Sequence, residues 1–481
     1  MTNPAKNHKA NLDAALLGLS LDRAGEVPLH AQLTEALRGL ILDGRAPSGT
    51  ALPASRALAQ DLGVSRVTTL AAYDQLLAEG YLEARRGAGT WVAPDLPPRP
   101  DSPAQAVGPE PAGPQPVPVF HPGLPDLAAF PHAQWARHLD AAWRHPDPAL
   151  LDLPDPLGWP PLRAAIAAHL SAWRGLDAAP GQIVITSGAS EALDLLARLL
   201  PTDSAVHVEA PCYGPVLDRL RAAGHVPVPL PTDADGLDTA RLGRAAAAIT
   251  TPSRNYPQGM TLPLARRLAL LDWAAQGDRL VIEDDYDSEF RFEGTPLPAL
   301  AALAPDRVAY VGSFSKLLTP SLRLGYIVLP PARVAALTAL IRQAGPQASL
   351  LPQPALARFM ERGDFATHLR RMRRLYGQRR RQLMAALASA LPGIVIPRDI
   401  ASGMHLVCDL GLGTPPDREV AAMARAAGLG LRALSTYPEA PATLSGLVLG
   451  FAAFPEAALD AGVARLASLL SQRVGTGASP R

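Results

Sequence analysis

Residues 311–326 read VGSFSKLLTPSLRLGY, an apolar strand-like run that leads into serines, a lysine and an arginine. The chain has 45 basic residues, but only three are lysines: Lys316 in this stretch, and Lys6 and Lys9 near the N-terminus. A GC-rich genome accounts for the excess of arginine, and it implies that Lys316 was kept where arginine cannot replace it. A guanidinium stays protonated at cellular pH, whereas a lysine amine can become a nucleophile. Lys316 is therefore the first candidate for covalent chemistry.

The overall composition indicates a globular protein. A length of 481 residues allows more than one domain, and 48% hydrophobic with 19% charged residues argues against disorder. The formal net charge of +1 gives no sign of a polyanionic partner. Cys212 and Cys408 lie far apart, which fits a reducing cytoplasm and predicts no disulfide framework and no metal site. Because no apolar run is long enough for a membrane helix or a signal peptide, we expect a cytoplasmic protein.

A proline-rich stretch divides the chain. Residues 94–118 contain ten prolines and almost no bulky apolar residues, which is typical of a semi-rigid linker. We therefore predict a domain over residues 1–93, this linker, a larger domain over 119–473 and a disordered tail over 474–481.

The N-terminal piece has the pattern of three helices and a hairpin. Apolar residues at helical spacing begin behind Pro28, and Gly44 ends that run. A second helix is predicted over residues 55–61, with Ser55 as its N-cap. The third starts after Val64 and runs to Gly80, with an inner face marked by Leu70, Tyr73 and Leu77. Residues 81–92, YLEARRGAGTWV, alternate around a glycine turn and predict a two-stranded wing.

Residues 28–93 resemble the GntR-type winged helix. The resemblance includes the LPASR turn, the GVSR entry to the third helix, the EGYL bend and the GAGT wing. It implies double-stranded operator DNA as a partner, and it implies DNA contacts from Arg56, Ser65, Arg66, Thr68, Arg86 and Gly87. Arg66 suits a guanine edge in the major groove, whereas Arg56 suits a phosphate. The alternative is a solvated arginine face, and nine basic residues against nine acidic ones over residues 1–93 predict modest, salt-sensitive binding by one domain.

The larger piece alternates strand-like and helical runs. The apolar runs QIVIT, AVHVE, RLVIEDD, RVAYVGS and LGYIVL alternate with helical patterns such as those over residues 190–200 and 215–223. This alternation predicts an α/β domain with a mainly parallel sheet. A basic helix over about 363–390 and a smaller α+β region follow.

The SFSK loop resembles that of fold type I enzymes that use pyridoxal 5′-phosphate (PLP). The resemblance implies a Schiff base between Lys316 and PLP, with Ser313, Ser315 and Arg323 on the cofactor phosphate. In IEDDYDSEF, Asp284 would pair with the pyridine nitrogen, and Tyr286 would donate to the phenolic oxygen O3′. An acid run that only caps a sheet edge is the alternative.

The remaining cofactor contacts follow from three further segments. The turn after QIVIT opens a helix, and a helix N-terminus suits a phosphate. The residues implied there are Ser187, Gly188, Ala189 and Ser190. Tyr213 matches the aromatic residue that stacks on the pyridine ring, although it could be a core tyrosine. Asn255 in TPSRNYPQG is the candidate amide donor to O3′, with neighbouring Tyr256 as the alternative.

A winged helix, a linker and an aminotransferase-like domain in one chain resemble the MocR family of bacterial transcriptional regulators. HPGLPDLAAFP, RRLALLDWA and EDDYDSEFR extend the resemblance over almost the whole chain. It implies an α+β N-terminal domain, a fold type I large domain with a small C-terminal α+β subdomain, and head-to-tail homodimers. PdxR-type members of the family answer to PLP itself, and GabR-type members answer to an amino acid, so the implied effectors are PLP or an amino acid.

The sequence departs from this pattern at the substrate end. Many relatives have histidine and glutamine where Arg254 and Asn255 stand, and Leu153 replaces a tyrosine that reaches the partner's phosphate in aminotransferases. The arginine that binds a substrate carboxylate in those enzymes corresponds to Val448. These changes favour a sensor of vitamin B6 or amino-acid metabolism over an enzyme, with at most slow half-transamination. A PLP-dependent aminotransferase with an incidental N-terminal module is the alternative.

Overall fold

The computed structural model divides into two compact units, Met1–Gln115 and Pro116–Arg481, which are considered separately below. The structure describes residue 16 and residues 19–85, 89–94, 96, 116–345 and 348–474. Most of the predicted linker and all but the first residue of the predicted tail lie outside the described residues.

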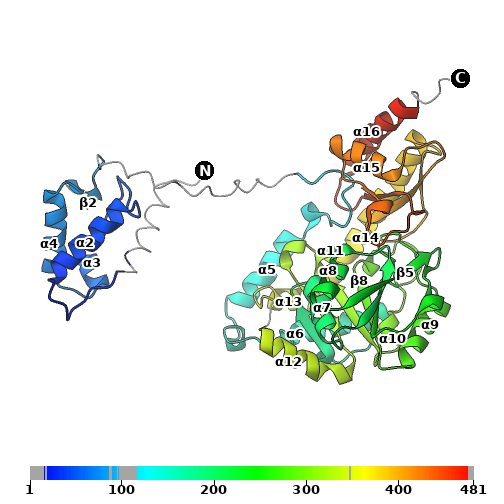
Figure 1. The fold of residues 1–481 in the computed structure, drawn as a ribbon, viewed down its shortest axis with the longest axis horizontal. Coiled ribbons are helices and arrows are strands. Elements are labelled where there is room, and N and C mark those ends of the chain that lie inside the picture. The colour runs from blue at the N-terminus through cyan, green and yellow to red at the C-terminus, as the bar shows by residue number, and fades with distance from the viewer. Residues whose placement is uncertain are drawn as a thin grey trace. The chain divides into compact units, whose positions relative to one another are not determined.

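The first unit is a winged helix, as the sequence predicts (Figure 1). Its described elements are the helices α2 (Leu29–Leu42), α3 (Ser55–Asp61) and α4 (Arg66–Ala78) and the strands β1 (Leu82–Arg85) and β2 (Gly89–Val92). The strands pair antiparallel, with Leu82 opposite Val92. Leu33, Leu37 and Tyr73 join Leu82 and Val92 in the small core.

Two details predicted for this unit are wrong. The inner face of α4 is formed by Thr69, Ala72, Tyr73 and Leu76, whereas Leu70 is 37% exposed. The prediction selected large apolar residues, but the small side chains of Thr69 and Ala72 let α4 pack closely against α2. Ser55 is the first residue of α3 and not its N-cap, because Ala54 holds that position and no side chain caps the helix.

The second unit is built on an eight-stranded sheet in the order β3-β10-β9-β8-β7-β4-β5-β6. Strands β9, β8, β7, β4 and β5 run parallel, whereas β10 is antiparallel to both its neighbours, so the sheet is mainly parallel as predicted. The strands span Ile183–Thr186 (β3), Ala205–Ala210 (β4), Val226–Asp233 (β5), Gly236–Leu237 (β6), Ala247–Thr250 (β7), Leu280–Asp285 (β8), Val308–Ser313 (β9) and Gly325–Val328 (β10).

Helices cover both faces of this sheet (Figure 1). Apolar side chains alternate between two buried clusters along the strands, as in β7, where Ala247 and Ile249 face one cluster and Ala248 the other. One face is covered by α7 (Ala189–Arg198), α8 (Gly214–Ala222) and α12 (Val334–Ala344). The opposite face is covered by α6 (Pro160–Arg174), α9 (Leu264–Ala275), α13 (Gln353–Glu361) and α14 (Asp364–Ala390).

A smaller antiparallel sheet completes the unit, in the order β11-β12-β14-β13. Its elements are β11 (Val395–Pro397), β12 (His405–Leu410), α15 (Asp417–Ala426), β13 (Arg432–Ala433), β14 (Leu447–Gly450) and α16 (Glu456–Val474). Two short helices, α10 (Leu300–Leu303) and α11 (Phe314–Leu317), flank β9, and α5 (His132–Trp143) precedes α6. The predicted fold type I domain with a small C-terminal α+β region is confirmed.

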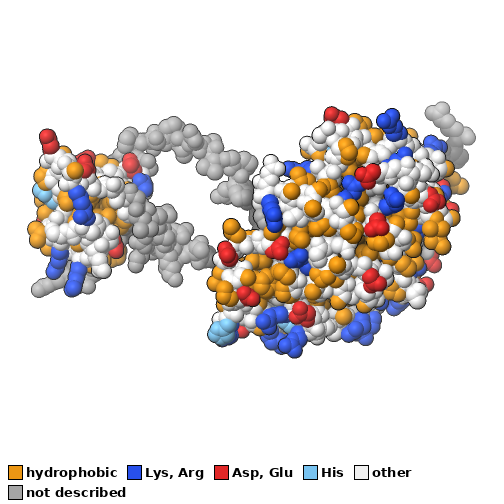
Figure 2. Space-filling model, turned by 90° about the horizontal axis from the view of Figure 1, so that it is seen from below, with side chains coloured by type: hydrophobic (Ala, Val, Ile, Leu, Met, Phe, Trp, Pro, Cys, Tyr) orange, Lys and Arg blue, Asp and Glu red, His pale blue; other side chains and the backbone are white. Residues whose placement is uncertain are grey.

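The surface carries charges of both signs. Figure 2 shows basic and acidic side chains interspersed over the displayed face of the larger unit, in keeping with the net charge of +1. Within the described ranges, no helix is both long and apolar enough to cross a membrane.

Candidate cofactor site and nucleic-acid interface

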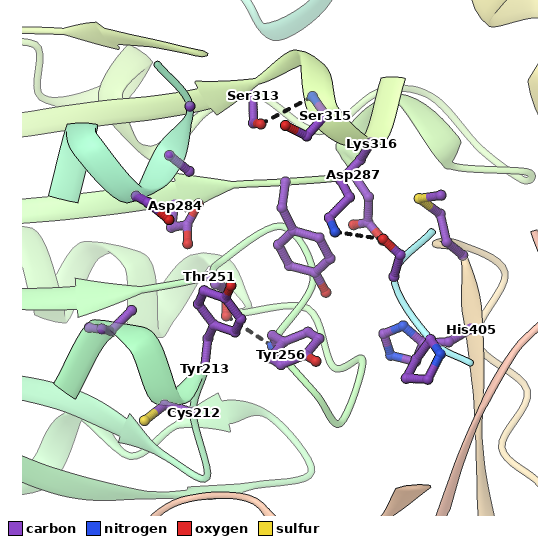
Figure 3. Close-up of a pocket in the computed structure, with 18 of the residues that line it drawn as sticks. Cys212, Tyr213, Thr251, Tyr256, Asp284, Asp287, Ser313, Ser315, Lys316 and His405 are labelled. Atoms are coloured by element: carbon purple, nitrogen blue, oxygen red, sulfur yellow. Dashed lines mark hydrogen bonds between the residues drawn. The ribbon is translucent and has the colours of Figure 1, made fainter. Parts of the chain in front are cut away.

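A cavity of about 400 Å³ lies where the carboxyl ends of the large sheet meet the small sheet. Most of the predicted cofactor residues line it, namely Gly188, Ala189, Ser190, Tyr213, Asp284, Tyr286, Ser313, Ser315, Lys316 and Arg323. Figure 3 shows Ser313, Ser315 and Lys316 on one side of this cavity and Tyr213 and Tyr256 on the opposite side. The fold thus brings together residues that lie more than a hundred positions apart in the chain.

Two neighbouring parallel strands place the lysine and the acid. Strand β8 carries Asp284 opposite Val311 of β9, and β9 runs directly into α11, which carries Lys316. The carboxyl ends of parallel strands open at one edge of a sheet, where ligands commonly bind. The spacing between Asp284 and Lys316 therefore follows from one strand pairing and one turn.

Lys316 is held at the cavity wall by the main chain. Its Nζ donates a hydrogen bond of 2.5 Å to the carbonyl oxygen of Gly123. Gly123 has a φ of 84°, and a Cβ at that position would lie 3.4 Å from Nζ, so glycine suits this close approach. Burial lowers the pKa of the Lys316 amine, while Asp287 and Asp284 oppose that shift. A lowered pKa favours the neutral, nucleophilic amine.

Asp284 lies in surroundings that disfavour its negative charge. Burial raises the pKa of its carboxyl to about 7, and the nearby carboxylates of Asp285 and Glu209 add to the shift, whereas Lys316 opposes it. A cation placed against this carboxyl would stabilise the ionised form. A protonated pyridine nitrogen is such a cation, so the surroundings of Asp284 fit the PLP ring.

The part of the cavity wall at the N-terminus of α7 has the features of an anion-binding site. Gly188, with a φ of 109°, precedes α7, and Ala189 and Ser190 begin that helix at the cavity wall. The turn lies against Gly325 of β10, where a Cβ would approach the Gly188 Cα to 2.9 Å. Free backbone N–H groups at a helix N-terminus favour a phosphate. The hydroxyls of Ser313 and Ser315 and the exposed Arg323 line the same cavity.

Three tyrosines form the aromatic part of the wall. Tyr213 is 45% exposed, and its ring packs edge-on against Tyr256 at 5.9 Å between centroids. The Tyr286 hydroxyl accepts a hydrogen bond of 3.0 Å from Arg254 Nη1. Burial raises the pKa of Tyr286 well above its ordinary value, so its phenol remains protonated and able to donate.

Two predicted residues do not line the cavity. The Ser187 backbone N–H donates to the Glu191 carboxylate at 2.5 Å. Asn255 is 2% exposed, and its side-chain oxygen and nitrogen have no hydrogen-bond partner among the described residues. Its neighbour Tyr256, the alternative donor in this segment, lines the cavity.

The two arginines predicted to contact DNA from the helices of the N-terminal unit lie on its surface. Arg56 and Arg66 are exposed, and neither has an ion-pair partner within the described ranges. By contrast, Arg38 pairs with Glu79 at 2.8 Å, and Arg85 pairs with Glu83. The first two arginines are therefore free to meet phosphate or base edges.

The two hydroxyls predicted at the recognition helix have a structural role. Ser65 is the N-cap of α4, and its Oγ accepts a hydrogen bond of 3.1 Å from the Thr68 N–H. The two hydroxyl oxygens also lie 2.8 Å apart. This cap fixes the start of α4, where Arg66 is the first helical residue. Arg86 and Gly87, predicted at the wing tip, lie outside the described residues.

Comparison with known proteins agrees with this two-part organisation. Residues 29–92 match the family model of bacterial regulatory proteins, gntR family, and residues 131–411 match the model of aminotransferase class I and II. The probable rhizopine catabolism regulatory protein MocR of Rhizobium meliloti is 38% identical, over 96% of this chain and 98% of that protein. This chain belongs to the MocR family of transcriptional regulators.

Other similarities of this MocR-family protein concern both regulators and enzymes. The HTH-type pyridoxine biosynthesis transcriptional regulator PdxR of Corynebacterium glutamicum is 37% identical, over 95% of this chain and 99% of that protein. The kynurenine aminotransferase of Pyrococcus horikoshii superposes with a TM-score of 0.67 at 25% identity, covering 74% of this chain and 91% of that one. LysN, the α-aminoadipate aminotransferase of Thermus thermophilus, gives 0.66 at 26% identity, covering 75% and 93%.

Several residues of the MocR-family cavity were not predicted. They are contributed by the segment before α5, by the ends of β4 and β8 and by the small sheet: His121, Gly123, Glu209, Asp287, His405 and Arg432. The HPG sequence at 121–123 belongs to the family resemblance, and no local pattern marks it as part of a cavity wall. Leu153, predicted to stand where aminotransferases have a tyrosine, is 89% exposed.

Proposed function

We propose that this regulator binds PLP through Lys316 and that PLP binding in the larger unit controls DNA binding by the winged helix. The observation that carries the proposal is the gathering of Lys316, Asp284 and the Gly188 turn around one cavity. These three features match an amine, a pyridinium partner and a phosphate cradle, which are the groups that PLP requires.

Different residues would contact different parts of PLP. Lys316 would hold the cofactor by its Nζ, Asp284 would face the pyridine nitrogen, and the Gly188 turn with Ser313, Ser315 and Arg323 would hold the phosphate. Tyr213 would stack on the ring, and Tyr286 or Asn255 would donate to O3′. When bound, PLP supplies a carbonyl that reacts with amines and a ring that withdraws electrons.

The winged helix supplies the DNA contacts of the proposal. Arg66 at the start of α4 would donate to a base in the major groove, and Arg56 would donate to a phosphate. Because DNA is the partner, we place the protein in the cytoplasm. We also propose that two chains pair as a head-to-tail homodimer, which would join two winged helices and raise their effective concentration on one operator.

The apolar side chain at position 448 favours effector sensing over catalytic turnover. This side chain is fully buried among Val407, Leu434 and Tyr437 and offers no cation for a substrate carboxylate. Orientation of a substrate contributes several kcal/mol to catalysis, about 7–11 in the best intramolecular cases. We therefore expect amino-acid conversion far below about 10 s⁻¹, a rate typical of enzymes.

Titration of the purified full chain with PLP tests the cofactor part of the proposal. Wild type is expected to gain a visible absorption band that persists after gel filtration, since the bound ring conjugates with the nitrogen of Lys316. Footprinting of the DNA that flanks its gene, with and without PLP, tests the regulatory part. A chain that stays colourless in excess PLP would refute the proposal.

A further inference from the structure

Val67 is an apolar side chain on the surface of the winged helix. It is the second residue of α4, and it is 74% exposed, more than any other large apolar residue in the described part of this unit. It does not belong to the small apolar core of the unit. Valine is also a weaker helix former than alanine or leucine. Neither core packing nor helix propensity therefore explains a valine at this position.

The first turn of α4 exposes two neighbouring side chains, those of Arg66 and Val67. Thr69 is fully buried, and the Thr68 hydroxyl lies 2.8 Å from the Ser65 hydroxyl of the N-cap. Arg66 has no ion-pair partner among the residues that the structure describes. A hydrogen-bond donor group without an acid partner and an exposed apolar group are thus adjacent at the start of this helix.

The outer face of α4 changes from apolar to acidic along its length. Leu70, about one turn after Val67, is 37% exposed and continues the apolar surface. Asp74, about one turn further, is exposed and acidic, so DNA phosphates would repel it. The outer face therefore suits DNA at its N-terminal end. This is the end of a recognition helix that contacts base edges in the major groove.

The shape of valine suits one particular base. Its two methyl groups branch at Cβ, and one χ1 rotamer strongly predominates for valine in a helix. Thymine carries a methyl group at C5 in the major groove, and apolar side chains recognise that group by contact. The other three bases lack this methyl group. Val67 next to Arg66 therefore matches a thymine next to the guanine that Arg66 would contact.

We infer that Val67 contacts the C5 methyl group of a thymine beside the base that Arg66 contacts. Val67 is thus a specificity-determining residue, and the DNA that it selects carries a thymine at this position. The inference rests on the proposed function, because it requires that α4 binds in the major groove. It adds a sequence preference that depends on an apolar contact and not on a hydrogen bond.

Replacement of single thymines by deoxyuridine tests the inference, because it removes only the methyl group and keeps every base pair. The probe is a duplex that covers the footprinted DNA beside the gene, and fluorescence anisotropy measures its affinity for the full chain at one salt concentration. Wild type should bind about threefold to tenfold more weakly when the thymine beside the base pair read by Arg66 is replaced. Arg66→Ala identifies that base pair, because it relaxes the preference there.

Three variants separate the methyl contact from other effects. Val67→Ala should bind both duplexes equally, with about the affinity of wild type for the deoxyuridine duplex, and alanine favours the helix, so this variant should fold. Val67→Thr keeps one methyl group at the same branch and should keep part of the preference. Val27→Ala is the matched control, because Val27 is a 55% exposed valine of the same unit that precedes α2. It should retain the full preference.

Three results would overturn the inference. They are a wild type that is insensitive to every deoxyuridine replacement, a Val67→Ala variant that keeps the sensitivity, and a Val27→Ala variant that loses it. Specific DNA binding without a dependence on Val67 and a thymine methyl group refutes this inference alone. A full chain that binds no DNA specifically refutes the proposed DNA binding and the inference together.

Discussion

The two units place their candidate functional cations in opposite surroundings. Arg56 and Arg66 of the winged helix are exposed and unpaired within the described ranges, whereas Lys316 of the larger unit is shielded at a cavity wall beside buried carboxyls. Burial changes the pKa of a group and strengthens its pairings, while exposed charges are screened by salt. The comparison predicts that single changes in the larger unit abolish cofactor binding or have large, pH-dependent effects, and that those in the winged helix have smaller, salt-dependent effects.

The largest effect is expected from Lys316→Ala. The variant should lose the visible PLP band entirely, because no other lysine lies within the described residues to replace the Nζ amine. Far-UV circular dichroism should remain that of wild type, since the Lys316 side chain makes one hydrogen bond among the described residues, to Gly123. A retained visible band at full intensity would show that PLP is bound elsewhere.

Asp284→Asn should separate cofactor binding from stability. The folded-state pKa of this acid is about 7 against an ordinary 3.8, so the PLP-free protein loses stability as pH rises between these values. Above pH 7 the variant should be more stable than wild type, by at most about 4 kcal/mol, because a buried unpaired carboxylate is removed. PLP affinity should nevertheless fall, because the pyridinium loses its partner.

Melting temperatures of the PLP-free proteins at pH 5 and pH 8, together with PLP titrations, measure both effects. The stabilising effect should be larger at pH 8 than at pH 5. An equal difference at both pH values would show that Asp284 does not titrate in this range.

Arg66→Ala is expected to cost about 1–3 kcal/mol on specific DNA and to relax the preference at one base pair. The physical reason is the loss of donors to a base edge at the start of α4. Binding of a set of operator variants, measured by fluorescence anisotropy, would reveal the relaxed position. Equal losses on specific and random DNA would assign Arg66 to the phosphates.

Arg56→Ala should have the smallest effect. Loss of one phosphate contact weakens all sequences alike and lowers the slope of log affinity against log salt by about one. Arg38→Ala is a matched control in the same unit, because the Arg38 guanidinium is already paired with Glu79 at 2.8 Å. A salt slope that falls as much in the control as in Arg56→Ala would indicate a general charge effect.

Local signals explain what the sequence predicted well. Lys316 stood out because the chain has only three lysines, and Asp284 followed from the resemblance of its segment and of the SFSK loop to fold type I enzymes; both residues line the cavity. The mainly parallel sheet followed from the alternation of apolar and helical runs. At Leu70 the same approach failed, because the close packing of α4 depends on the small residues Thr69 and Ala72 and not on the large apolar ones.

The part of the cavity wall that the small sheet forms could not be predicted in the same way. Arg432 faces Val448 only through the pairing of β13, a two-residue edge strand, with β14. Such a short strand has no periodicity of its own to detect. No pattern in the sequence marked Arg432 as a cavity residue, and none placed Arg254 against Tyr286 and Asp287.

The central claim is that PLP bound at Lys316 controls DNA binding, and one measurement tests it directly. The affinity of the full chain for the DNA that flanks its gene is measured with and without PLP, at one fixed salt concentration, for wild type and for Lys316→Ala. We predict that PLP changes the affinity of wild type severalfold or more and leaves that of Lys316→Ala unchanged. Identical wild-type affinities with and without PLP, on DNA that the protein does bind specifically, would contradict the account.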